Sequence, residues 1–208
     1  ILSFISYMII IFNNYESNFL INNFDFKLLA LAILLTLIPV IKYQPSNEYT
    51  TSDAFNLTSF LLLVGLGLNF LLSTRNYSLS YFILLMLIPI FTDTFAYFGG
   101  MLIGKHKVTK LSPKKTWEGC ITGLLVSTIL SSIYYIYFIG NTLTLNKVLI
   151  LLLASIIAQI GDLFFSAIKR NHNIKDFSNL IPGHGGIIDR LDSIIFVSYL
   201  FIIFIDYL

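Results

Sequence analysis

The sequence contains one cysteine, Cys120, and has no His or Cys spacing of the kind that binds zinc. A single cysteine excludes a disulfide within this sequence and any metal site built from several thiolates. Three other signatures are also missing: a P-loop, a Gly-x-Gly-x-x-Gly loop and a Gly-x-Ser-x-Gly elbow. We therefore expect any group transfer to be direct, without an enzyme-bound intermediate.

Charge is also scarce. Only 12% of the residues are charged, against about 25% in an ordinary soluble domain. Hydrophobic residues make up 56% of the chain, and its mean hydropathy is +0.82. Long apolar runs in such a chain predict an all-α, polytopic transmembrane helical bundle.

About seven apolar stretches are candidate membrane spans. We place them at residues 1–12, 26–41, 54–73, 80–103, 119–139, 147–168 and 187–206. Nothing suggests a second domain, so we expect a single integral membrane domain over residues 1–208. Within it, residues 1–79 form N-terminal helices with the weaker assignment, and residues 80–208 form the catalytic helices and loops.

A polar segment from Asp162 to Asp192 interrupts the apolar pattern near the end of the chain. Asp162 lies inside one apolar run, and Asp189 and Asp192 open the next. Ionisable groups at bilayer depth are costly and usually functional. Carboxylate oxygens suit a hard divalent cation, so we expect Asp162, Asp189 and Asp192 to hold Mg²⁺, with a second cation left open. The alternative is simple ion pairing, with Asp189 on Arg190 or another Arg or Lys, and Asp162 on Lys169.

The same segment is rich in groups that bind phosphate. Glycine lets backbone N–H groups approach an anion, so Gly185 and Gly186 are expected to bind a phosphate oxygen. His184 is a phosphate donor or an acid/base group. The predicted catalytic set is Asp162, Lys169, Arg170, His184, Asp189, Arg190 and Asp192.

A second basic stretch precedes the span at 119–139. Ser112, Lys114, Lys115 and Thr116 are of residue types that hold phosphate oxygens, although paired lysines at a membrane surface are often only topology determinants. Asp93 lies in the middle of the span at 80–103, where a lone carboxylate needs a cation or a polar cavity. From the residues alone, a functional role for Asp93 and structural pairing are equally favoured.

Together these two stretches resemble the phosphatidate cytidylyltransferases, or CDP-diacylglycerol synthases. The resemblance rests on Asp93 to Tyr97, on Ser112 to Gly119, and on the ordered spacing from Ser166 through Pro182 to Asp192. It implies that CTP and phosphatidate react to give CDP-diacylglycerol and pyrophosphate. It also favours a site role for Asp93. The expected substrate-binding residues are Asp93, Ser112, Lys114, Lys115, Thr116, Ser166, Lys175, Asp176, Gly185 and Gly186.

The distribution of basic residues predicts the orientation. Loops after the spans at 26–41, 80–103 and 147–168 hold nine Lys and Arg, and the opposite loops hold three. The excess predicts cytoplasmic motif loops, and we expect a bacterial inner membrane. We expect no nucleic-acid partner, and a homodimer stays open. Two alternatives remain: another CTP-dependent lipid or polyprenol phosphotransferase, and an ion-coupled transporter using intramembrane Asp residues.

Overall fold

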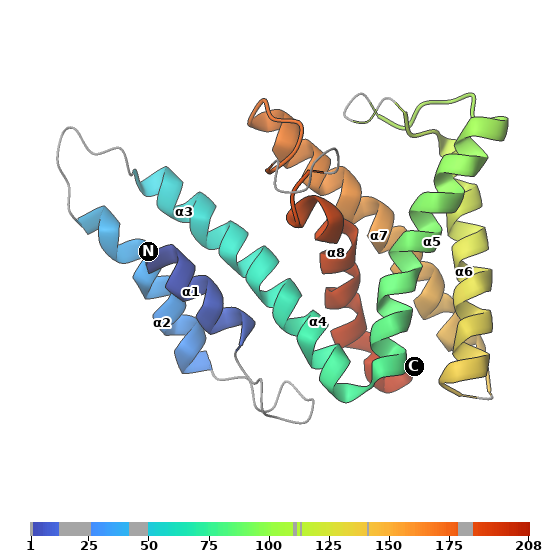
Figure 1. The fold of residues 1–208 in the computed structure, drawn as a ribbon, viewed down its shortest axis with the longest axis horizontal. Helices are drawn as coiled ribbons and strands as arrows, with labels where there is room; N and C mark the ends of the chain where they lie inside the picture. The colour runs from blue at the N-terminus through green and yellow to red at the C-terminus, as the bar shows by residue number, and fades with distance from the viewer. Residues whose placement is uncertain are drawn as a thin grey trace. The chain divides into compact units, whose positions relative to one another are not determined.

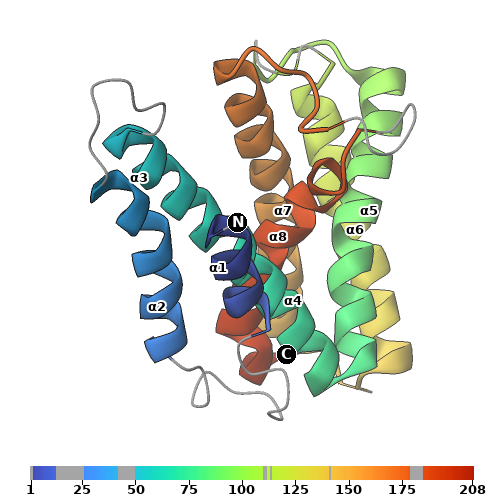
Figure 2. The same cartoon turned by 60° about the vertical axis from the view of Figure 1, so that its left-hand side comes forward.

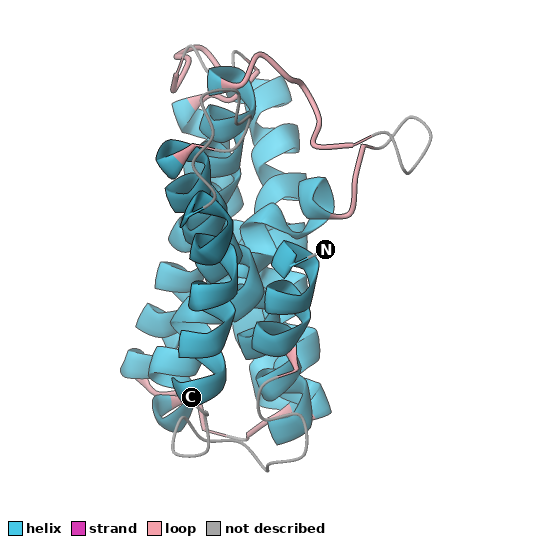
Figure 3. Ribbon diagram, turned by 90° about the vertical axis from the view of Figure 1, so that its left-hand side faces the viewer, coloured by secondary structure: helices cyan, strands magenta, loops and turns pink. Residues whose placement is uncertain are grey.

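The computed structural model describes residues 2–12, 26–41, 50–109, 112, 114–140, 142–178 and 185–208. Over these residues the chain is almost wholly helical, and none of them lies in a β-strand (Figure 3). The predicted all-α class is therefore confirmed. The chain divides into two compact units, Ile1–Ser78 and Leu79–Leu208, each of which we describe separately.

The first unit is built from short apolar helices and one longer helical segment. Its elements are α1 (Leu2–Ile11), α2 (Phe26–Leu37), the 3₁₀ turn η2 (Ile38–Ile41), α3 (Thr51–Phe60), the π-helical turn η3 (Leu61–Gly65) and α4 (Leu66–Tyr77). Ile10, Ala32 and Leu61 form its buried core. The buried amide of Asn69 donates to the carbonyl oxygens of Ile10 and Ile11, so it satisfies backbone groups left open at the end of α1.

The second unit contains four longer helices. They are α5 (Leu79–Ile103), α6 (Trp117–Phe138), α7 (Leu145–Asn171) and α8 (Ile188–Phe204), followed by the 3₁₀ turn η4 (Ile205–Tyr207). Helix α5 packs along α6, and α7 packs along α8, which also contacts α5 (Figures 1 and 2). The predicted polar segments lie in the α5–α6 and α7–α8 loops and in the adjoining turns of α7 and α8.

Glycines allow α5 and α6 to approach closely. A Cβ added at Gly119 would lie 2.5 Å from the Ala96 carbonyl oxygen, and one at Gly123 would lie 2.5 Å from the Thr92 carbonyl oxygen. No side chain fits at such distances, so the two backbones touch at these positions. Close backbone approach at small residues with helical spacing is a common way for helices to pack in lipid.

Buried hydroxyl groups join α5 to α6 and α7. The hydroxyl of Thr92 lies 3.0 Å from the Ser127 hydroxyl and 2.8 Å from the Ser155 hydroxyl. Both Thr92 and Ser127 also donate to the carbonyl oxygen of Ile88, which precedes Pro89 in α5. All three hydroxyl side chains are fully buried. This Thr92 cluster links three helices through hydrogen bonds, as is common where helices pack in lipid.

Within the part of the chain that the structure describes, four helical segments are long and apolar enough to cross a membrane: Thr51–Tyr77, Leu79–Ile103, Trp117–Phe138 and Leu145–Asn171. Helices α1 and α2 are apolar but short, and α8 has 17 residues. The length and apolar composition of these helices thus identify an integral membrane protein. The predicted seven spans are not confirmed, although each predicted stretch does contain helix.

The Gly123 contact predicts a packing-dependent stability. Gly123→Ala would force the Thr92 backbone away and should lower the free energy of unfolding by roughly 1–3 kcal/mol, the range for overpacking. Leu125→Ala on the exposed face of α6 is the control and should cost much less. Thermal unfolding in detergent measures both. Equal midpoints for the two variants would contradict close packing at Gly123.

Candidate active site

Two loops of the second unit meet at one end of its helices. The described parts of the α5–α6 loop and of the α7–α8 loop lie at the same end in both views (Figures 1 and 2). These loops carry most of the predicted phosphate-binding residues, and the neighbouring helix turns carry the predicted acids. The sequence motifs are therefore brought together in space.

Lys115 and Asp162 form the first ion pair of the site. The ammonium group of Lys115, from the α5–α6 loop, contacts a carboxylate oxygen of Asp162 on α7. The side chains keep 19% and 27% of their surface exposed, so the pair is partly covered but reachable. Sequence analysis placed both residues in the site without pairing them. The expected alternative, a pair between Asp162 and Lys169, is not formed.

Asp93 also belongs to this group. Its side chain on α5 is exposed, and the charges of Lys115, Asp162 and Asp192 act on it. None of the ion pairs among the described residues involves Asp93, and its role in the site stays a prediction. It directly follows Thr92, whose hydroxyl cluster fixes this turn of α5.

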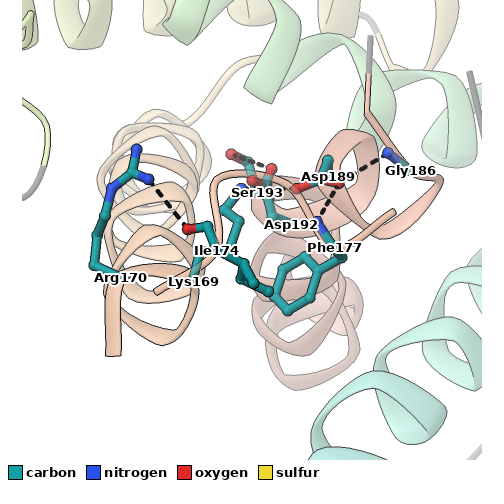
Figure 4. Close-up of polar contacts among 8 residues, drawn as sticks. All are labelled: Lys169, Arg170, Ile174, Phe177, Gly186, Asp189, Asp192 and Ser193. Carbon is teal, nitrogen blue, oxygen red and sulfur yellow. Dashed lines mark hydrogen bonds and ion pairs between the residues drawn. The ribbon is translucent and has the colours of Figure 1, made fainter. Parts of the chain in front are cut away.

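Asp189 is the centre of the second group (Figure 4). One carboxylate oxygen accepts a 2.9 Å contact from the Lys169 ammonium group, and the side chains are only 6% and 11% exposed. The other oxygen accepts backbone N–H groups of Phe177 and Gly186, each at 2.9 Å. Asp189 thus ties both described ends of the α7–α8 loop to the start of α8. The pair with Lys169 agrees with the ion-pairing alternative for Asp189, which allowed Arg190 or another basic residue.

Phe177 is a site residue that sequence analysis missed. Besides donating its N–H to Asp189, it places its ring 5.4 Å from the Lys169 ammonium group, within the range of a cation–π contact. A phenylalanine in an apolar-rich chain carries no sequence signal for such a role. Gly185 has a φ of 80°, which suits glycine and lets the chain turn into Gly186.

Asp192 lies one turn further along α8. Its side chain is buried, and one carboxylate oxygen accepts the N–H of Ser193 at 2.7 Å. The charges of Asp162, Lys169 and Asp189 act on it. Members of both ion pairs, Lys115–Asp162 and Lys169–Asp189, thus act electrostatically on Asp192.

The charges of this cluster do not balance. Among the described groups that act on Asp93 and Asp192, four are carboxylates (Asp93, Asp162, Asp189 and Asp192) and two are ammonium groups (Lys115 and Lys169). When all are ionised, two negative charges remain in excess. An excess of this kind, made of hard oxygen donors, suits a divalent cation.

The present side-chain arrangement does not enclose a metal ion. No three His, Cys, Asp or Glu side chains of the described residues lie close enough together to hold one. The carboxylates of Asp162 and Asp189 instead form ion pairs with Lys115 and Lys169. The Mg²⁺ ligand set therefore stays a prediction.

The other predicted residues lie around this cluster. Thr116 is the N-cap of α6, where its hydroxyl oxygen accepts the N–H of Gly119. Arg170 donates to the carbonyl oxygen of Ile174 at the end of α7. Ser112 and Ser166 are half-buried, and Lys114, Lys175, Asp176 and Arg190 are exposed. Pro182 and His184 lie outside the described residues.

Comparison with known proteins identifies the family. The model of the cytidylyltransferase family matches residues 1–208. The chain is 36% identical to a phosphatidate cytidylyltransferase of Staphylococcus saprophyticus over 179 residues, 85% of this chain and 68% of that protein. It is 34% identical to the enzyme of that name from Bacillus subtilis over 181 residues, 85% of this chain and 66% of the relative. Identity to one from Staphylococcus aureus is 41% over 154 residues, 73% of this chain and 58% of the relative.

The apolar helices define an integral membrane protein, and a charged cluster at one end of its second unit brings together residues of both sequence motifs. The chain belongs to the cytidylyltransferase family, whose members are nucleotidyltransferases. It spans about two thirds of the length of the Staphylococcus saprophyticus and Bacillus subtilis relatives. The resemblance seen in the two sequence motifs is confirmed.

The buried Lys169–Asp189 pair predicts a large stability effect. Lys169→Met leaves the Asp189 carboxylate without its cation and should lower the free energy of unfolding by about 3 kcal/mol. Lys175→Met removes an exposed lysine of the same loop and should change it by less than about 0.5 kcal/mol. Denaturation of the purified protein in detergent gives both values. A Lys169→Met variant as stable as Lys175→Met would contradict the pairing.

Proposed function

We propose that this protein is a membrane-bound phosphatidate cytidylyltransferase, which makes CDP-diacylglycerol and pyrophosphate from CTP and phosphatidate. Its relatives carry that name over most of this chain. The observation that carries the proposal is the charged cluster in which Lys115 of the α5–α6 loop contacts Asp162 on α7, while the charges of Lys115, Asp162 and Asp192 act on Asp93 on α5. Such a cluster can accept anionic substrates only with cations present, and both proposed substrates are anionic.

The chemistry asks little of a general base. The phosphate of phosphatidate is already an anionic oxygen nucleophile, so it attacks the α-phosphate of CTP directly and pyrophosphate leaves. The main barrier is the approach of two anions and the charge on the leaving group. Positively charged side chains at fixed positions reduce that barrier, which is the role proposed for the lysines and arginines of the two loops.

The basic residues divide by position. Lys115 and Lys169 lie within the cluster, so each is placed to hold a phosphate oxygen once it leaves its carboxylate partner. Arg170, Lys175 and Arg190 are exposed on the α7–α8 side and would clamp the triphosphate, arginine being suited to bidentate contacts. Lys114 and Lys115 of the α5–α6 loop would capture the lipid phosphate at the interface.

Mg²⁺ belongs to the proposal because of the charge excess of the cluster. Asp162, Asp189 and Asp192 would hold it, and the bound cation would offset the charge of the triphosphate. The two lysines now on Asp162 and Asp189 are the groups that it would replace. Their release would supply ammonium groups for the substrates.

We further propose that the two loops face the cytoplasm of a bacterium and that the protein lies in its inner membrane. The proposal is supported by the excess of Lys and Arg in these loops and by the bacterial origin of the relatives. CTP is available on that side. A homodimer would be compatible with the glycine-lined helices, but nothing in the proposed reaction requires one.

The first test is CTP-dependent conversion of phosphatidate to CDP-diacylglycerol by the purified chain in detergent. Mg²⁺ should support product formation, EDTA should abolish it, and Asp162→Asn should lower kcat on the order of 10²-fold or more, as loss of a preorganised charge does. Retained thermal stability of Asp162→Asn is the control. CTP binding without product would favour another lipid acceptor, and neither binding nor product would favour the transporter.

A second test separates the two adjacent lysines. Lys115→Ala removes the partner of Asp162 and should lower kcat/KM by about 10- to 100-fold, because the phosphate loses a positioned charge. Lys114→Ala removes an exposed lysine and should cost distinctly less. Initial rates at varied phosphatidate give both values. Equal losses would show that these lysines act only as a surface charge.

A further inference from the structure

Glu118 makes three contacts that the proposed reaction does not use. One carboxylate oxygen accepts the backbone N–H groups of Lys105 and His106, at 3.1 and 3.2 Å. The other lies 2.6 Å from Nδ1 of the His106 imidazole. Glu118 stands in the first turn of α6, and its partners directly follow the end of α5 at Ile103. One side chain thus joins the end of one helix to the start of the next.

The segment between these ends is a small hairpin that carries Lys115. The Trp117 N–H donates to the His106 carbonyl oxygen, and the Val108 N–H donates to the Lys115 carbonyl oxygen. Lys107 and Thr116 form a bridge between the two sides. We call residues 105–109 and 114–116 the Lys115 hairpin. Its base is closed by Glu118, and the Lys115 ammonium group projects from it onto Asp162.

The ordinary role of an acid in the first turn of a helix does not account for this geometry. Such an acid interacts favourably with the helix dipole from any position near the N-terminus. The Glu118 carboxylate instead reaches back to residues 12 and 13 positions earlier in the chain. A side chain that satisfies two loop N–H groups and an imidazole fixes the loop path, and the loop path sets where Lys115 stands.

We propose that Glu118 is a positioning residue: through its contacts with Lys105 and His106 it holds the Lys115 hairpin so that the Lys115 ammonium group reaches the charged cluster. The inference rests on the proposed function, in which Lys115 binds a phosphate. Glu118 itself touches no substrate in this scheme. Its length and its acceptor oxygens matter, and its negative charge matters little.

Three substitutions separate length from charge. Glu118→Gln keeps the length and an oxygen acceptor; its kcat/KM should stay within about fivefold of wild type, because charge-assisted hydrogen bonds are only roughly twice as strong as neutral ones. Glu118→Asp keeps the charge but is one methylene shorter. It should lose about 10- to 100-fold in kcat/KM, the cost of a misplacement near 1 Å, and Glu118→Ala should lose as much. Asp53→Asn, at the start of α3, is the control for an acid in a helix first turn.

Amide hydrogen exchange of the same proteins in detergent tests the contacts without relying on activity. The amides of Lys105 and His106 should exchange faster in Glu118→Asp and Glu118→Ala, and as slowly as wild type in Glu118→Gln. If wild type forms no CDP-diacylglycerol, the proposed function fails while exchange still decides the Glu118 contacts. Unchanged exchange in Glu118→Asp would overturn the inference.

A combination with Lys115→Ala tests whether Glu118 acts through Lys115. Adding Glu118→Asp to Lys115→Ala should lower kcat/KM no further than about twofold, because coupled residues are not additive. Fully additive losses would overturn the positioning role. A Glu118→Gln variant as inactive as Glu118→Asp, with wild-type exchange, would also overturn it by showing that the charge itself is used. If Glu118→Ala does not survive purification, the Gln and Asp variants decide alone.

Discussion

Two lysine–aspartate pairs hold the charged end of the second unit together. Lys115 on Asp162 ties the α5–α6 loop to α7, and Lys169 on Asp189 ties α7 to α8. Without these cations the four clustered carboxylates would repel one another in a region of low dielectric. The same repulsion makes the site receptive to other cations. The ion pairs thus reduce the repulsion among the carboxylates and link the loop and the two helices.

Backbone contact and buried hydrogen bonds hold together the helices that carry the cluster. Lipid gives little hydrophobic drive between helices, so close backbone contact and hydrogen bonds must hold them. Gly119 and Gly123 allow close backbone contact between α5 and α6. The Thr92 cluster provides hydrogen bonds among α5, α6 and α7. Because Thr92 precedes Asp93, the packing contact and the charged group share one turn of α5. Rigid packing in this turn keeps the exposed carboxylate at a fixed place.

Much of the helical pattern could be predicted from the sequence, because long apolar runs have few other stable structures in a membrane. The site residues could be predicted because Asp, Lys and Arg are rare in these apolar runs, where an ionisable group usually has a function. Their partners could not be chosen the same way. A pair between Asp162 and Lys169 was the alternative to a metal site, but Asp162 pairs with Lys115, since the choice depends on how the loop after α5 returns. The meeting of Thr92, Ser127 and Ser155 depends on the relative rotation of three helices, which no local pattern sets.

Two roles escaped prediction for the same reason. Phe177 contributes a backbone N–H and a ring face, and neither depends on a distinctive residue type. Glu118 looks like an ordinary acid at the start of a helix, and its reach to Lys105 and His106 follows from the hairpin path. The structure therefore adds chiefly those contacts in which common residues act through the backbone.

The place of Cys120 has a practical consequence. This half-buried thiol stands one turn into α6, and the charges of Lys115, Asp162 and Asp93 act on it. Since the sequence contains no other cysteine, the chain carries a single natural attachment point for a spin label or an environment-sensitive dye beside the charged cluster. The arrival of nucleotide or lipid could then be followed spectroscopically in the protein without first removing competing thiols.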